Sequence, residues 1–127
     1  MNLNYFDVVF LEQEASIKYP DSFAIITAHN PKDIILSKSE NQSRNHSLVQ
    51  SIKETMKLGP CIVGMSKDEK HQELSVIIEG TRNELIALGR KFEQHAIFWV
   101  KGDNLELQDC VSMKRYDLGS FRERIKK

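Results

Sequence analysis

The sequence has 127 residues, of which 40% are hydrophobic and 28% charged, as is typical of one soluble globular domain with a single core. Lysine and arginine together number 18, as do aspartate and glutamate, so the protein as a whole has no net field to attract nucleic acid or an anionic membrane. No apolar run approaches the ~20 residues of a membrane span and no secretion signal is recognisable, so we expect a cytoplasmic protein with no membrane partner.

The first elements in chain order are two strand-like segments. Residues 4–11 are aromatic and β-branched, which favours a strand, although Phe6, Val9 and Phe10 also share helical spacing and leave a short helix open. After a turn at Pro20, residues 23–28 form a continuous apolar run. This run predicts a central strand that is covered on both faces.

A helix is predicted next, because Ser37 and Glu40 have the spacing of a capping box. Its apolar stripe runs from Leu48 to Met56, and Gly59-Pro60 is its expected end. Thr81 and Glu84 repeat the capping box and open a second helix, whose inner face carries Leu85, Leu88, Gly89 and Phe92.

The remaining elements read as strands and turns. Residues 61–63, 73–78, 96–100 and 105–107 are predicted strands, with a charged turn at 67–70 and a tight turn at 102–104. The alternation of strands and helices predicts an α+β fold: a mostly antiparallel sheet with two helices packed on one face, resembling a split βαβ core with additions at both ends. We expect one domain over residues 1–127.

The C-terminal segment 113–127 is basic, with six basic and two acidic residues and so a charge of +4. Leu118, Phe121 and Ile125 recur at the spacing of an amphipathic helix, which predicts a basic helix or tail packed on the domain. The alternative is a solvated arm that contacts a polyanion.

Polar residues follow the buried strand and enter the core-facing stripe of the first helix. Asn41 and Asn45 lie on the same helical face as Leu48, so their amides require partners. These partners are either backbone groups of the 29–33 loop or a ligand, and Arg44 is placed to pair with Glu40. The candidate ligand-binding residues are Asn30, Asn41, Arg44, Asn45 and Gln94.

The candidate catalytic residues are Glu73 and His71, which with Ser75 occupy one face of a predicted strand. A histidine, a carboxylate and a hydroxyl in one row suit acid–base chemistry, but an ordinary solvent-side row has the same pattern. No motif with metal-ligand spacing is present, so we expect neither a metal nor a cofactor. Cys61 and Cys110 adjoin strand-like sequence and are expected as small buried hydrophobic residues.

Four separated motifs stand in register over about residues 20–110: Phe23–Pro31; Ser37, Glu40, Asn41, Arg44, Asn45 and Leu48; Gly64, Glu73 and Ser75; and Phe92, Gln94 and Ala96–Val100. Together they resemble the bacterial and phage domain-of-unknown-function family 3293. The resemblance supports the choice of site residues and implies no activity, because none is assigned to the family.

Two functions remain as hypotheses. The first is a small ligand-binding domain or enzyme that acts on a phosphate-bearing molecule, a nucleotide or nucleic acid, bound at the N-terminus of the first helix beside Arg44 and His29. The alternative is a non-catalytic protein-interaction module, such as an inhibitor or adaptor, which uses a sheet edge or the basic tail. The sequence leaves open whether the protein is an enzyme and whether it forms oligomers.

Overall fold

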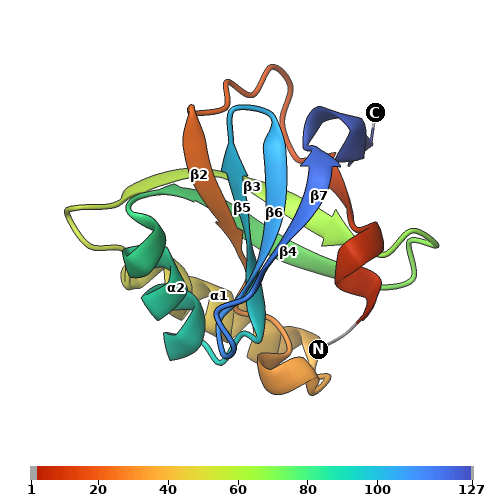
Figure 1. The fold of residues 1–127 in the computed structure, drawn as a ribbon. Coiled ribbons are helices and arrows are strands. Elements are labelled where there is room, and N and C mark those ends of the chain that lie inside the picture. The colour runs from red at the N-terminus through yellow and green to blue at the C-terminus, as the bar shows by residue number, and fades with distance from the viewer. Residues whose placement is uncertain (1–2, 127) are drawn as a thin grey trace.

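The computed structural model describes residues 3–126 and shows an eight-stranded, curled sheet with two α-helices (Figure 1). The strand order is β7-β6-β5-β2-β4-β3-β1-β8, and every neighbouring pair is antiparallel except β1 and β8. In chain order the elements are η1 (Leu3–Asp7), β1 (Val9–Glu12), β2 (Ser22–Ile26), η2 (Pro31–Asp33), α1 (Lys38–Gln50), β3 (Lys57–Met65), β4 (Gln72–Glu79), α2 (Arg82–Lys91), β5 (Ala96–Lys101), β6 (Asn104–Asp109), β7 (Arg115–Ser120), η3 (Arg122–Arg124) and β8 (Ile125–Lys126); η denotes a 3-10 helix.

The centre of the fold is the β2-α1-β3-β4-α2-β5 unit, whose strands lie in the order β5-β2-β4-β3. This is the split βαβ arrangement, and the predicted fold class is confirmed. Both helices lie on the same side of the sheet (Figure 1). Their apolar side chains, including Leu48, Leu85 and Leu88, pack with Ala24 and Ile26 of β2 in one buried cluster.

A second buried cluster fills the other face of the sheet. It includes Phe23 and Ile25 of β2, which pack with Phe10 of β1 and with Phe121 beside η3. The Phe121 ring lies 5.5 Å from both the Phe10 and Phe23 rings, centroid to centroid. Strand β2 is therefore buried on both faces, as its continuous apolar run predicts.

Both predicted capping boxes are present, at Ser37 for α1 and Thr81 for α2. The expected end of the first helix near Gly59-Pro60 is wrong: α1 stops at Gln50, and these two residues belong to β3. The register of β3 against β4 shifts between Leu58 and Cys61, which accommodates the proline because it has no N–H to donate. On this strand Cys61 is exposed, contrary to prediction, whereas Cys110 is buried.

The predicted C-terminal helix is also wrong. Its three apolar residues belong to different elements: Leu118 to strand β7, Phe121 to the start of η3 and Ile125 to β8. The three side chains have the spacing of a helix, but a strand followed by a tight turn brings them to the same core. Of the alternatives for residues 4–11, each holds in part, since η1 precedes β1.

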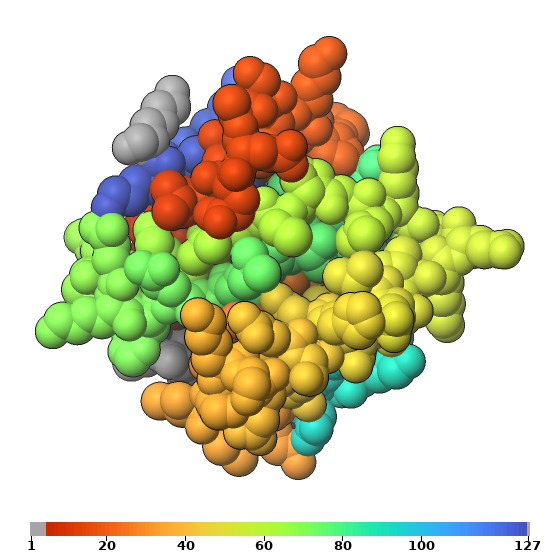
Figure 2. Space-filling model, turned by 180° about the vertical axis from the view of Figure 1, so that it is seen from behind, coloured from red at the N-terminus to blue at the C-terminus, as the bar shows by residue number. Residues whose placement is uncertain are grey.

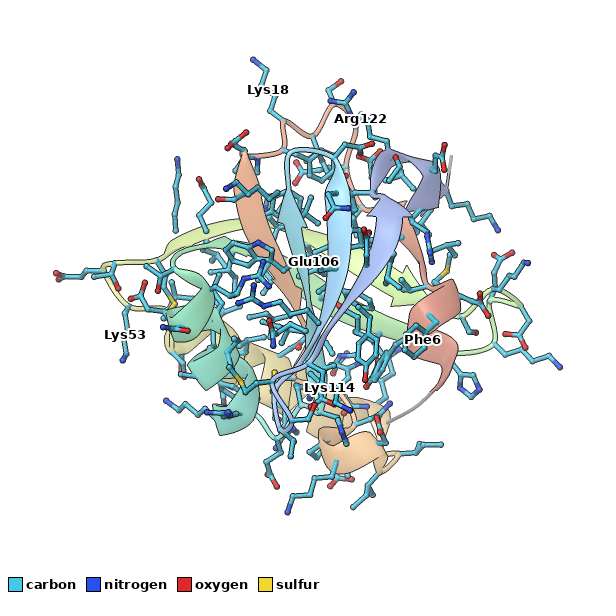
Figure 3. All side chains as sticks on the ribbon, in the orientation of Figure 1. Phe6, Lys18, Lys53, Glu106, Lys114 and Arg122 are labelled. Atoms are coloured by element: carbon cyan, nitrogen blue, oxygen red, sulfur yellow. The ribbon has the colours of Figure 1, made fainter. Side chains whose placement is uncertain are left out.

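The basic residues of this segment are dispersed. Lys114 and Arg122 lie at opposite ends of the molecule (Figure 3). Arg124 turns inward and donates to the carbonyl oxygens of Phe6, Val8 and Leu118 at 2.8–3.2 Å. The segment is therefore built into the sheet. Within residues 3–126, no helix has both the length and the apolar character needed to cross a membrane.

Candidate functional site

A pocket opens where several strand ends meet. Because β4 and β5 both run antiparallel to β2, their first residues lie beside its last ones, and the end of β3 lies beside the start of β4. The apolar part of the lining is Val8, Ile25, Gly64, Met65, Ala96 and Phe98, and the polar part is Tyr5, Thr27, Ser66, His71, Glu73, Ser75 and Gln94. The polar edge continues into a second hollow, which includes Asn30, Asp33 and Lys70.

Glu73, near the start of β4, is the carboxylate of this pocket. Its Oε2 accepts a hydrogen bond from Nδ2 of Asn30 at 3.3 Å. Burial raises the pKa of Glu73 to about 7 and the negative charge of Asp33 adds to the rise, while the Asn30 hydrogen bond opposes it. A carboxyl group with a pKa near neutrality can both take and give a proton, which is the property that acid–base chemistry requires.

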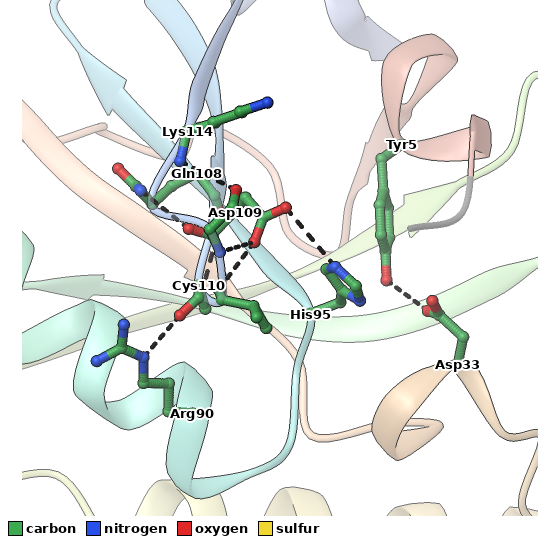
Figure 4. Close-up of polar contacts among 10 residues, drawn as sticks. Tyr5, Asp33, Arg90, His95, Gln108, Asp109, Cys110 and Lys114 are labelled. Carbon is green, nitrogen blue, oxygen red and sulfur yellow. Dashed lines mark hydrogen bonds and ion pairs between the residues drawn. The ribbon is translucent and has the colours of Figure 1, made fainter.

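Tyr5 and Asp33 lie at the polar edge, where the pocket meets the second hollow, and no pattern in the sequence selects them. The Tyr5 hydroxyl donates to Oδ1 of Asp33 at 2.9 Å, so η1 is tied to η2 (Figure 4). Burial raises the pKa of Tyr5 far above its ordinary value, and the charges of Asp33 and Glu73 act in the same direction. The only local signal for Asp33 is its place in a turn after Asn30-Pro31, and Tyr5 has none beyond being aromatic.

His71, Glu73 and Ser75 face the same way as predicted, since all three line the pocket; His71 directly precedes β4, and the other two belong to it. His71 is exposed, whereas Ser75 is buried and donates to the backbone carbonyl oxygen of Glu73 at 3.2 Å. Of these three groups, Glu73 therefore has the environment most altered from that of a solvated side chain.

The two asparagines of α1 hold the loop that follows β2. Oδ1 of Asn41 accepts from the backbone N–H of Asn30 at 3.0 Å, and its Nδ2 donates to Oδ1 of Asn30 at 3.0 Å. Asn45 accepts from the N–H of Ala28 at 3.2 Å and donates to the carbonyl oxygen of Leu74 at 3.3 Å. Of the two roles considered from the sequence, these contacts support the structural one, and they place Asn30 next to Glu73.

Arg44 is bound to the backbone, and its predicted pairing with Glu40 is wrong. Its Nε donates to the carbonyl oxygen of Ala28 at 2.7 Å and its Nη2 to that of Phe92. Glu40 instead accepts from the Ser37 N–H in the capping box. A carboxylate thus already occupies the N-terminus of α1, and it opposes the binding of a phosphate there.

Other polar groups near the site are engaged in structural contacts. His29 lines a groove beside α1, and burial lowers its pKa. Nε2 of His95 lies 3.6 Å from Oδ2 of Asp109 (Figure 4). Asp109 in turn holds the turn before β7, because its Oδ1 accepts from the backbone N–H groups of Val111 and Ser112. Burial raises the pKa of Cys110 to about 11, so its thiol is not an activated nucleophile.

Among the residues described, no group of three or more His, Cys, Asp or Glu side chains is arranged to hold a metal ion.

The family model described as "Protein of unknown function (DUF3293)" matches residues 26–97, which is more than half of the chain. The chain therefore belongs to this family. The matched region runs from the end of β2 through α1, β3, β4 and α2 to the first residues of β5, and so contains Asn30, Glu73 and Gln94. Comparison with curated proteins and with solved structures finds no match.

Proposed function

We propose that this domain binds a small organic molecule in the strand-end pocket and that Glu73 exchanges a proton with it. The observation that carries the proposal is the position of Glu73 in a largely apolar pocket, where a single side-chain hydrogen bond, from Asn30, reaches its carboxylate among residues 3–126. Burying a carboxylate costs free energy that packing alone does not return, and binding sites are where such costs are commonly found.

The surrounding contacts support a preformed pocket. Asn41 and Asn45 fix the 28–30 loop, Arg44 ties this loop to the end of α2, and the Tyr5–Asp33 hydrogen bond holds η1 against η2. A pocket whose walls are held in this way loses little entropy when a ligand enters. The candidate residues from the sequence thus support the pocket, and Glu73 and Gln94 enter its lining.

The test is to fill the pocket. The Cβ of a residue replacing Gly64 would lie 3.9 Å from Val8, Phe10 and Ser75 atoms, which is ordinary contact, so Gly64→Leu should fold with its side chain in the pocket. Benzyl alcohol, benzylamine and phenyl phosphate are the probes, and backbone amide shifts in NMR spectra are the readout. We expect at least one probe to shift the amides of Thr27, Gly64 and Ala96 in the parent.

We expect the same probe to leave the corresponding amides of Gly64→Leu unshifted. Val111→Leu, an exposed position away from the pocket, is the control and should bind like the parent. If none of the three probes shifts pocket amides, or if Gly64→Leu folds and binds equally well, the proposal is refuted.

A groove between α1 and β4 supports a second candidate, the protein-interaction module. Ile35, 79% exposed, and Leu74, 37% exposed, line one hollow here, and Val49, 40% exposed, lines an adjoining hollow that also includes Leu74. Figure 2 shows this face of the molecule, with α1 in orange and yellow below the green of β4. Exposed apolar residues that gather along a groove suit an apolar segment of a partner. This function would be favoured if a protein partner binds the parent but not the double variant Ile35→Asp/Leu74→Asp. The double variant should still bind the small-molecule probes.

A further inference from the structure

We propose that the strand-end pocket selects a small ammonium or amidinium compound, with Glu73 pairing with the cationic group and Gln94 accepting a hydrogen bond from it. This inference rests on the proposed function and specifies the chemical class of the ligand. Three features of the pocket and its polar edge point to a cation that donates hydrogen bonds: an amide oxygen, a carboxylate in the lining with a second one in the adjoining hollow, and two aromatic rings.

The amide oxygen belongs to Gln94, in the turn before β5. Nε2 of Gln94 donates to two carbonyl oxygens, those of His29 at 2.9 Å and Phe92 at 3.2 Å. Because both neighbours are acceptors, the amide nitrogen must face them and the amide orientation is settled. Gln94 is only 5% exposed and lines the pocket, yet its Oε1 accepts no hydrogen bond within residues 3–126. Since no buried side-chain oxygen or nitrogen within residues 3–126 lacks a partner, Oε1 must be accessible from the pocket, where it can accept a hydrogen bond from a ligand.

The carboxylates belong to Glu73 and Asp33. Burial raises the pKa of Glu73, and repulsion by the negative charge of Asp33 adds to the rise. A cation placed beside Glu73 relieves this repulsion and replaces part of the hydration that burial removes. An anion would instead add a third negative charge to the same edge.

The aromatic rings belong to Tyr5 and Phe98, which both line the pocket with centroids 6.2 Å apart and planes at 85°. The electron-rich face of an aromatic ring attracts a desolvated cation. The same rings and the apolar wall accommodate the hydrocarbon part of the ligand.

The other charged and titratable groups that face Glu73 come from the neighbouring elements. These are Tyr5 of η1, Asp33 of η2, His71 directly before β4, and Lys70 at the outer edge. His71 and Lys70 are exposed at the mouth, so solvent screens them. Glu73 lies deeper, and its carboxylate therefore has the strongest effect on a ligand inside the pocket.

The experiment compares three probes of similar shape and different charge: benzylamine, benzyl alcohol and phenyl phosphate. At pH 8.5 we expect benzylamine to bind the tightest in calorimetric or NMR titrations. Glu73→Gln keeps the shape of the side chain and should weaken benzylamine at least about tenfold while changing benzyl alcohol less than about twofold. Glu79→Gln, at the other end of the same strand, is the matched control and should bind like the parent.

The affinity for benzylamine should also rise about thirtyfold between pH 5.5 and 8.5, the change in ionised fraction of a carboxyl group that titrates near pH 7. We therefore expect His71→Gln to keep most of the rise and Glu73→Gln to lose it.

The outcomes separate this inference from the function on which it rests. If phenyl phosphate or benzyl alcohol binds in the pocket more tightly than benzylamine, the domain binds small molecules but the inferred ligand class is wrong. If benzylamine binds in the pocket but Glu73→Gln binds it equally well, the assigned pairing is wrong. If no probe binds, both proposals are overturned.

Discussion

Replacing Glu73 by glutamine is expected to stabilise the folded protein above pH 7. The carboxyl group of Glu73 titrates at about 7 in the folded protein, against an ordinary value of 4.5, because burial and the charge of Asp33 disfavour its ionised form. The folded state therefore holds a proton more tightly than the unfolded state does. Glutamine is neutral at every pH and retains an oxygen that can accept from Asn30.

The magnitude follows from the two pKa values. Between pH 4.5 and about 7 the folded state binds more protons than the unfolded state, so the free energy of unfolding falls as the pH rises through this window. A tenfold change in proton affinity is ~1.4 kcal/mol, which makes the full loss roughly 3 kcal/mol. The loss is complete above pH 7 and absent below pH 4.5, and for a chain of this length it corresponds to roughly 10 °C in melting temperature.

The measurement is urea denaturation of the parent and of Glu73→Gln at intervals from pH 4.5 to 8.5. His29 has a lowered pKa and so adds stability as the pH rises through its titration, but it does so equally in both proteins. The difference between the two curves therefore isolates Glu73. Parallel curves, or a variant less stable than the parent at pH 8, would refute the reasoning; Glu79→Gln should follow the parent throughout.

Three further changes test the packing. Gly89→Ala should lower the urea midpoint, because a Cβ there would lie 2.8 Å from Ile97, and this crowding should outweigh the ~1 kcal/mol that alanine gains in a helix. Asn45→Leu should cost about 1–3 kcal/mol of unfolding free energy, since two backbone groups lose their partner; an unchanged midpoint would contradict this structural role. Truncation after Val111 removes β7 and the buried Phe121, so circular dichroism should show loss of the fold rather than a folded domain without an arm.

Much of the local structure was readable from the sequence. Both capping boxes occur at the predicted serine and threonine, because a cap depends on residues three apart in the chain. The hairpin around Gly102 and the doubly buried strand β2 were predicted for the same reason: their signals are local turn chemistry and a continuous apolar run. The end of α1 was misplaced by about nine residues, because Gly59-Pro60 reads as a helix stop although it belongs to a strand.

The candidate site was only half readable. Side chains alternate between the two faces of a strand, so the sequence alone predicts that His71, Glu73 and Ser75 face the same way. All three line the pocket, and no tertiary contact is needed to predict this. The partners of Arg44 did not follow: sequence spacing placed Glu40 beside it, whereas the fold brings the carbonyl oxygens of Ala28 and Phe92 within its reach.

The sequence by itself thus determined the α+β class, the helix starts, the face on which Glu73 lies and the membership of a family. Only the tertiary structure decided that Tyr5 and Asp33 join Glu73, that residues 115–120 form a strand, and that the asparagines of α1 support the 28–30 loop. The physical reason is the distance along the chain over which each kind of interaction acts. Caps, turns and alternation depend on neighbours a few residues apart, whereas burial, charge repulsion and sheet pairing depend on groups that meet only when distant segments pack together.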